Sequence, residues 1–425
     1  MLAAARAVLG SVEMDAESGK RPAAGARAMR QLAYLQQMRE RHGDVFPLRT
    51  LGEQLLVVGD PELARQVFHA PTDVLRAGEG NRRVLGWLLG EHSLILLDGE
   101  RHMSHRRMLL PPLHGRRLER HAATIRALAE EQLAGWPRGE EVAMLPRVRA
   151  LTLDVVLCAL FGHAEDLGAL RAALLELLSP VEAGSVEARI PAEPIARAEA
   201  LVGDQVAARR ADARIEQRDD VLSLLLGARY EDGSPLSDAE LRDELMTLIF
   251  AGTETTAASL AWALERLARA PRALARAAGE ASAKSGPYID AVIQETLRMR
   301  PAVPMAARLA ARPFQLAEHS IAPGTVIAVS ALLIHHRADL YPEPMAFRPE
   351  RFLDRPPGTY TWIPFGGGVR RCIGGSFALL EMRIVLSALL SQMVPRVAAP
   401  APEGLLGRGN TLVPARGARI VLEPS

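Results

Sequence analysis

Cys372, one of two cysteines in the chain, lies in a setting that favours metal-ligand chemistry. It belongs to the segment PFGGGVRRCIGGSFALLEM, in which three glycines precede it and a helical pattern follows. Glycines permit tight turns and let the backbone approach a flat ligand closely. Backbone N–H groups at the start of a helix donate to a sulfur and favour negative charge there. The segment therefore predicts a thiolate, which is the form of cysteine that binds metal.

A second segment with chemical potential, AGTETT, lies inside the longest predicted helix, residues 237–270. Glycine and threonine are poor helix formers, so their presence there calls for a reason. Gly252 would leave room above a flat cofactor, Thr255 could hydrogen-bond dioxygen, and Glu254 could relay protons to it from solvent. Threonine and glutamate in a long helix are equally compatible with solvation or with a bond to the preceding turn.

Two further patterns have simple structural explanations. Glu295 and Arg298 are three residues apart on one helix face, which by spacing alone indicates a surface ion pair. Two histidine pairs lack the cysteine or acidic partners that a zinc site needs, although each could in principle bind metal. These pairs are His102 with His105, and His335 with His336.

The elements that would position these residues are mainly helical. Helical periodicity dominates residues 97–281, and strand-like alternation occurs before and after this region, at residues 45–59 and 311–330. We expect the two β portions to pair, which predicts a mainly α fold with minor β. The expected organisation is a loose tail over residues 1–25 and a single domain over residues 26–425.

Composition excludes several classes of protein. The chain has 425 residues and a formal net charge of +1, so no overall charge indicates a nucleic-acid or membrane-surface binder. No apolar stretch is long enough for a membrane anchor. Two cysteines make no disulfide framework, and Cys158 is read as a small buried hydrophobe. We therefore expect a cytoplasmic protein, as a monomer.

Four motifs resemble those of the cytochrome P450 family. Phe365, Gly368, Arg370, Cys372 and Gly374 match the pattern F-x-x-G-x-R-x-C-x-G. AGTETT resembles the family's A-G-x-D/E-T-T segment, and QETLR together with FRPERF resembles its E-x-x-R network. HMSHR resembles its H-x-x-x-R helix. The likeness runs from about residue 30 to the C-terminus.

The resemblance implies a P450 fold in which haem b lies between the long oxygen-facing helix and the helix after the cysteine. It makes Cys372 the iron ligand and Glu254 and Thr255 the acid and alcohol that deliver protons. Glu295, Arg298 and Arg351 become a buried network that braces the cysteine loop. The other implied cofactor contacts are His102, Arg106, Ala251, Arg308, Phe365, Gly366, Arg370, Ile373 and Gly374. The implied substrate pocket contains Trp87, Leu88, Phe250, Val303, Met305 and Leu412.

The implied reaction is hydroxylation or epoxidation of a hydrophobic small molecule with O2. Because the chain has no flavin, iron–sulfur or dinucleotide motif, electrons are expected from a ferredoxin or flavodoxin with its reductase. An acidic partner could dock on a basic patch, for which the candidates are Arg106, Arg107, Arg116, Arg117 and Arg371. Two alternatives keep the haem: a peroxide-driven peroxygenase or isomerase, and a non-catalytic sensor.

Overall fold

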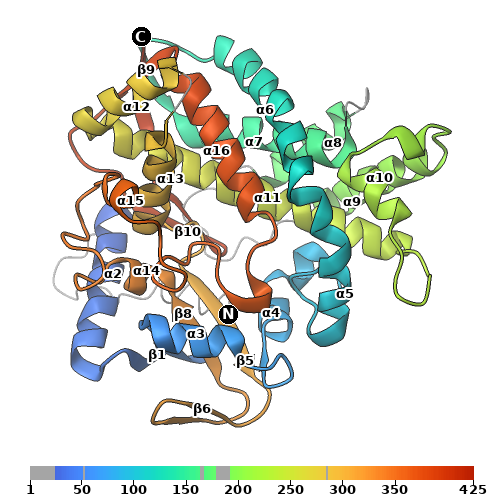
Figure 1. The fold of residues 1–425 in the computed structure, drawn as a ribbon, viewed down its shortest axis with the longest axis horizontal. Coiled ribbons are helices and arrows are strands. Elements are labelled where there is room, and N and C mark those ends of the chain that lie inside the picture. The colour runs from blue at the N-terminus through green and yellow to red at the C-terminus, as the bar shows by residue number, and fades with distance from the viewer. Residues whose placement is uncertain (1–23, 51–52, 163–166, 179–191, 284–285) are drawn as a thin grey trace.

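A computed structural model of the chain describes residues 24–50, 53–162, 167–178, 192–283 and 286–425. It confirms the predicted mainly helical fold with minor sheets (Figure 1). Most of the predicted tail, residues 1–23, lies outside the described residues, and the first helix of the described part begins at Ala24. Within the described part of the chain, none of the helices combines the length and the apolar character that a membrane-spanning segment needs.

The elements have the following bounds. The α-helices are α2 (Ala24–His42), α3 (Pro61–His69), α4 (Gly78–Leu89), α5 (Gly99–Leu109), α6 (Arg116–Ala134), α7 (Met144–Phe161), α8 (Gly168–Leu178), α9 (Ala192–Arg210), α10 (Val221–Gly227), α11 (Asp238–Ala268), α12 (Pro271–Ala283), α13 (Tyr288–Met299), α14 (Ala331–His335), α15 (Arg351–Asp354) and α16 (Gly375–Leu390). The 3-10 helices are η1 (Pro111–Leu113), η2 (Ile215–Gln217) and η3 (Gly368–Arg370). The strands are β1 (Val45–Thr50), β2 (Glu53–Val58), β3 (Leu75–Arg76), β4 (Glu141–Ala143), β5 (Met305–Ala310), β6 (Phe314–Leu316), β7 (His319–Ile321), β8 (Val326–Ser330), β9 (Met393–Val397), β10 (Leu405–Arg408), β11 (Thr411–Pro414) and β12 (Arg419–Pro424).

The largest sheet joins the two ends of the chain, with strand order β1-β2-β8-β5-β3. Strand β2 pairs in parallel with β8, so that Leu55 lies beside Val326, and β8 pairs antiparallel with β5. The two β portions therefore pair as the sequence predicted. Helices α2 and α3 lie with this sheet, apart from the helical bundle (Figure 1).

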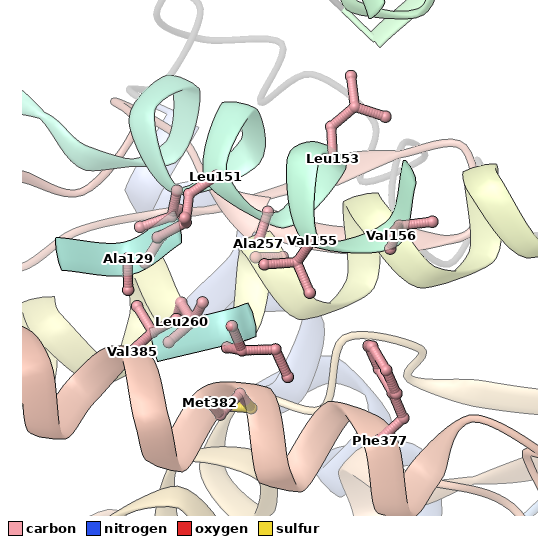
Figure 2. Close-up of a cluster of buried hydrophobic side chains, with 14 of the residues drawn as sticks. Ala129, Leu151, Leu153, Val155, Val156, Ala257, Leu260, Phe377, Met382 and Val385 are labelled. Carbon is pink, nitrogen blue, oxygen red and sulfur yellow. The ribbon is translucent and has the colours of Figure 1, made fainter. Parts of the chain in front are cut away.

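The main core forms where α7, α11 and α16 meet (Figure 2). Leu151 of α7, Leu260 of α11 and Val385 of α16 are all buried in this cluster, together with Ala129 of α6. Burying a side chain of this size contributes roughly 1.5–3 kcal/mol. This packing fixes α11 against α16, the two helices between which the cofactor is expected.

Local signals explain where the key helices begin. Ser237 and Glu240 form a reciprocal capping box at the start of α11, as their spacing predicted. Asp60 accepts the N–H groups of Glu62 and Leu63 ahead of α3, and Pro61 occupies its first position. The start of each helix is therefore encoded by three or four adjacent residues.

Candidate active site

The loop before Cys372 is packed tightly against α3. Gly366 and Gly368 have φ values of +67° and +62°, a region that side chains rarely adopt. A Cβ atom added at Gly368 would overlap the carbonyl oxygen of Phe68, and one at Gly367 would meet the Phe68 ring. The loop closes where the Cys372 N–H donates to the Phe365 carbonyl at 3.0 Å. Glycines are thus required for both the turn and the close approach.

Cys372 stands at the end of this loop, three residues before α16 begins. The residue is solvent-accessible, yet desolvation by the surrounding protein raises the pKa of its thiol. The Gly374 and Gly375 N–H groups and the charges of Arg106 and Arg371 act in the opposite direction and lower that pKa. These groups favour the thiolate, but burial has the larger effect and favours the neutral thiol, so thiolate formation stays a prediction.

A cluster of basic side chains gathers close to Cys372. His102 and Arg106 lie on α5, Arg308 on β5, and Arg370 in the cysteine loop. Burial and the charges of the three arginines lower the pKa of His102 to about 3. Burial and the neighbouring Arg370 lower the pKa of Arg308 to about 10. Four residues that the sequence placed in one site are thus brought together.

This cluster is short of anionic partners. Arg370 pairs with Asp98 at 2.5 Å, but within the described residues Arg106 and Arg308 form no ion pair and donate to backbone carbonyls instead. The buried Nδ1 atom of His102 has no hydrogen-bond partner there either. Haem carries carboxylates on a flat ring. Carboxylate oxygens accept hydrogen bonds from basic side chains that lack an anionic partner. The residues present fit the expected cofactor.

Helix α11 presents AGTETT differently from what the sequence suggested. Ala251 is exposed and Thr255 half-buried, and the Thr255 hydroxyl donates to the Ala251 carbonyl at 2.7 Å. The position of Gly252 corrects our expectation. A Cβ atom there would lie 3.2 Å from Val156 on α7, so the glycine permits close packing of two helices rather than leaving room above a cofactor.

The Glu254 carboxylate is already engaged in an ion pair. It accepts two hydrogen bonds from Arg149 of α7, at 2.7 and 3.0 Å, and Arg408 of β10 lies 3.4 Å away. Both members of the Arg149 pair are largely buried. A direct relay of protons from solvent through a free Glu254, as the sequence suggested, is not available in this arrangement. No sequence pattern indicates Arg149, which lies on a different helix.

A network of charged side chains around Glu295 is connected through His335 to the segment just before the cysteine loop. Arg298 binds the Glu295 carboxylate through two nitrogens, at 2.7 and 2.9 Å, and Arg351 reaches it at 3.1 Å. Glu295 and Arg298 are fully buried, so the surface ion pair suggested by spacing alone is excluded. Arg298 also donates to the His335 carbonyl at 2.8 Å. This ties α13 to α14.

Sequence patterns indicated His335 only as one of a histidine pair that could bind metal, and gave no sign that it contacts the cysteine loop. Its Nε2 accepts the Ile363 N–H at 2.8 Å, just before the cysteine loop, and burial lowers its pKa to about 3. It is therefore neutral and anchors the loop. In the described part of the chain no three His, Cys, Asp or Glu side chains are arranged to hold a metal ion, which leaves the histidine-pair metal sites without support.

The expected pocket residues lie in unlike environments. Phe250, Val303 and Met305 are half-buried, as is Leu88. Trp87 is 41% exposed. Leu412 is a correction, because it is only 1% exposed and packs in the core with Trp262, whose indole N–H donates to the Leu412 carbonyl.

Comparison with known proteins identifies one matching family and several similar sequences. The family model described as Cytochrome P450 matches residues 24–175 and 196–394. The "Putative cytochrome P450 137" of Mycobacterium tuberculosis (strain ATCC 25618 / H37Rv) is 39% identical over 402 residues, which are 91% of this chain and 84% of that protein. The "Putative cytochrome P450 135B1" of Mycobacterium bovis (strain ATCC BAA-935 / AF2122/97) is 37% identical over 409 residues, covering 92% and 86%.

Solved structures share the fold. Retinoic acid bound cyanobacterial CYP120A1 aligns with a TM-score of 0.79 and 25% identity, over 92% of this chain and 94% of that one. A cytochrome P450 named CYP102L1 aligns with a TM-score of 0.80 at 23% identity, over 93% and 94%, and this second likeness concerns the fold alone.

Proposed function

Because the chain belongs to the cytochrome P450 family, whose members bind haem b and act as monooxygenases, we propose that it hydroxylates or epoxidises a hydrophobic small molecule with O2 and with electrons from a separate protein. The observation that carries the proposal is the position of Cys372. Its thiol is solvent-accessible, N–H donors lie beside it, and a cluster of basic groups with few anionic partners is close by.

The chain's own residues would hold the cofactor from two sides. Haem, when bound, supplies the iron that activates dioxygen, and a thiolate ligand favours cleavage of the O–O bond. Cys372 would be that ligand. His102, Arg106 and Arg308 would hold the carboxylates, with Arg370 acting beside them through its pair with Asp98. Other candidate contacts are Ala251, Phe365, Gly366, Ile373 and Gly374.

Proton delivery is assigned to α11. The Thr255 hydroxyl lies one turn from the exposed Ala251 and donates a hydrogen bond to the Ala251 carbonyl, so its oxygen can accept a hydrogen bond from a further donor. Glu254 would act once its bonds to Arg149 open, because a carboxylate that accepts two guanidinium hydrogen bonds exchanges protons poorly with water. The break between Glu254 and Arg149 is thus proposed as a condition for proton transfer.

The substrate is proposed to be hydrophobic. The half-buried Phe250, Val303 and Met305 are apolar, and an apolar lining selects for hydrophobicity more than for a particular skeleton. The relative that was solved with retinoic acid bound supports the same substrate class.

The electron donor is proposed to be a ferredoxin or flavodoxin, with its reductase. Val369, which is 43% exposed, and the exposed cation Arg371 lie within three residues of Cys372 in sequence, and Arg117 at the start of α6 is also exposed. Exposed cations suit an acidic partner. Arg107 is engaged with Glu231 at 2.5 Å, and the side chain of Arg116 lies outside the described residues. Both cysteines are free thiols, which suits the proposed cytoplasmic location.

One experiment tests the reaction class. The purified holoenzyme would be supplied with a ferredoxin, its reductase, NAD(P)H and labelled dioxygen, against a panel of hydrophobic compounds. We expect a product that contains one labelled oxygen atom. Turnover with hydrogen peroxide alone, and none with the reductase system, would contradict the proposal and support a peroxygenase. That second candidate is favoured by one observation, the engagement of Glu254 with Arg149.

A further inference from the structure

The backbone carbonyls on both sides of Cys372 are held from outside the loop. The Arg371 carbonyl accepts a hydrogen bond from Nη2 of Arg106 at 2.7 Å, and the Ile373 carbonyl accepts one from Nε2 of His114 at 3.1 Å. A carbonyl oxygen can only accept, so His114 must carry a proton on Nε2. His114 lies between η1 and α6, 259 residues from Ile373 in sequence. Nothing in the motifs around Cys372 indicates it.

The peptide group that His114 binds also reaches the sulfur. The Ile373 C=O and the Gly374 N–H belong to one planar peptide unit. The Gly374 N–H is among the groups that donate to Cys372 and lower its pKa against the larger effect of burial. A donor at the carbonyl end polarises the peptide and makes its N–H a stronger donor, because hydrogen bonds in a chain reinforce one another. His114 is thus one peptide unit away from the sulfur.

We propose that His114 is a positioning residue for the thiolate ligand. Its Nε2–H holds and polarises the Ile373–Gly374 peptide, strengthens the hydrogen bond to the Cys372 sulfur, and so limits the charge that the sulfur donates to iron. The inference rests on the proposed function, since it requires Cys372 to ligate haem. Hydrogen bonds to ligand atoms are an established means of tuning a haem protein.

His114 is better suited to this test than Arg106. Arg106 belongs to the basic cluster that would hold the haem carboxylates, so replacing it would disturb two contacts at once. His114 is exposed, and Ile373 is its one hydrogen-bond partner in the described part of the chain. A substitution there removes the hydrogen bond without opening the core.

The test compares donors with non-donors of similar size in the holoenzyme. His114→Met removes the N–H and keeps side-chain length, His114→Ala removes both, and His114→Gln restores an N–H donor. The measurements are the midpoint reduction potential of the haem iron and the Soret position of the ferrous–CO complex, at one fixed pH. More charge on the sulfur stabilises ferric iron, so we expect the Met and Ala variants to have a more negative potential than the wild type. The Gln variant should return toward the wild-type value.

A matched control is available on α6. The ring of His121 packs edge-on against Phe377 of α16 at 5.3 Å between centroids, and among the described residues it makes no hydrogen bond. His121→Met should leave the potential unchanged. The proposal is overturned if the Met and Ala variants keep the wild-type potential, or if Gln shifts it as Met does. A wild-type protein without a thiolate-ligated spectrum would instead contradict the proposed function.

Discussion

At the scale of single residues, the site depends on how each charged or polar group is paired. Arg149 and Glu254 satisfy each other, whereas the buried Nδ1 atom of His102 has no hydrogen-bond partner among the described residues. A buried polar atom without a partner costs about 1–3 kcal/mol, so a ligand that supplies a hydrogen-bond partner there would be stabilised. Groups whose charges and hydrogen bonds are paired within the protein therefore stabilise the fold, whereas groups that lack such a partner are the candidates for binding a ligand.

Thr255 is the residue whose loss should affect chemistry most and folding least. Thr255→Val keeps the shape and removes the hydroxyl that binds the Ala251 carbonyl. We expect product formed per NAD(P)H consumed to fall by about 10²-fold, the lower end of the contribution of a positioned proton-transfer group. Hydrogen peroxide should appear instead. The matched control is Thr256→Val, at a buried neighbouring position. Equal coupling in wild type and Thr255→Val would remove the hydroxyl from the proposed proton path.

Glu381 on α16 gives a prediction about stability. Its carboxyl is fully buried, and in the part of the chain that the structure describes both oxygens lack a hydrogen-bond partner. Burial raises its pKa well above the usual 4.5, and the nearby Thr152 only partly opposes this. Above pH 4.5 the unfolded chain releases this proton while the folded protein keeps it, so folding loses stability as pH rises toward the raised pKa.

Glu381→Gln removes that penalty. The free energy of unfolding of the variant, relative to wild type, should increase by up to about 1.4 kcal/mol per pH unit above pH 4.5 and then level off. Urea unfolding followed at several pH values measures this difference. A difference that does not change with pH would show that Glu381 is ionised in the folded protein.

At the scale of elements, the cysteine loop is held by parts that are distant in sequence. Phe68 of α3 packs under its glycines, the Trp362 indole donates to the Gln294 carbonyl of α13 at 3.1 Å, and His335 receives the Ile363 N–H. Loops of this kind carry function because rigid elements fix them. The Glu295–Arg298 pair belongs to that support.

Arg298→Ala should destabilise the segments that hold the cysteine loop in place. The substitution leaves Glu295 buried with one fewer partner, and breaking a buried ion pair in this way costs roughly 3–5 kcal/mol. We expect a loss of thermal stability together with release of haem, measured by the Soret absorbance during heating. Arg312→Ala, which removes an exposed pair with Asp73, is the control and should change little. A variant as stable as the control would show that the network does not brace the loop.

Sequence patterns predicted the elements better than the contacts between them. The start of α11 follows from Ser237 and Glu240, because a capping box involves residues three apart. The Arg149–Glu254 pair joins positions 105 residues apart, and no local periodicity encodes it. Gly252 illustrates the same difficulty of predicting contacts from sequence. A glycine inside a helix is unusual and could be noticed from the sequence, but only the packing of α11 on α7 reveals that it faces Val156.

At the scale of the whole molecule, the site requires both ends of the chain. Strand β2 pairs with β8, and α3 supports the loop that leads into α16, so segments far apart in the sequence lie side by side next to the helical bundle (Figure 1). The motifs that predicted the cofactor lie at residues 102–106, 251–256, 295–298 and 365–374. Of these motifs, the structure brings the His102–Arg106 segment of α5 together with Arg370 and Cys372 of the cysteine loop.

The most direct test of the central claim is the absorption spectrum of the ferrous–CO complex. A thiolate opposite carbon monoxide moves the Soret band to markedly longer wavelength than a neutral ligand does. We expect this band in the wild type and in Cys158→Ser, where the other free cysteine is replaced, and its loss in Cys372→Ala. A purified protein without porphyrin, or a Cys372→Ala variant with an unchanged spectrum, would contradict thiolate ligation by Cys372.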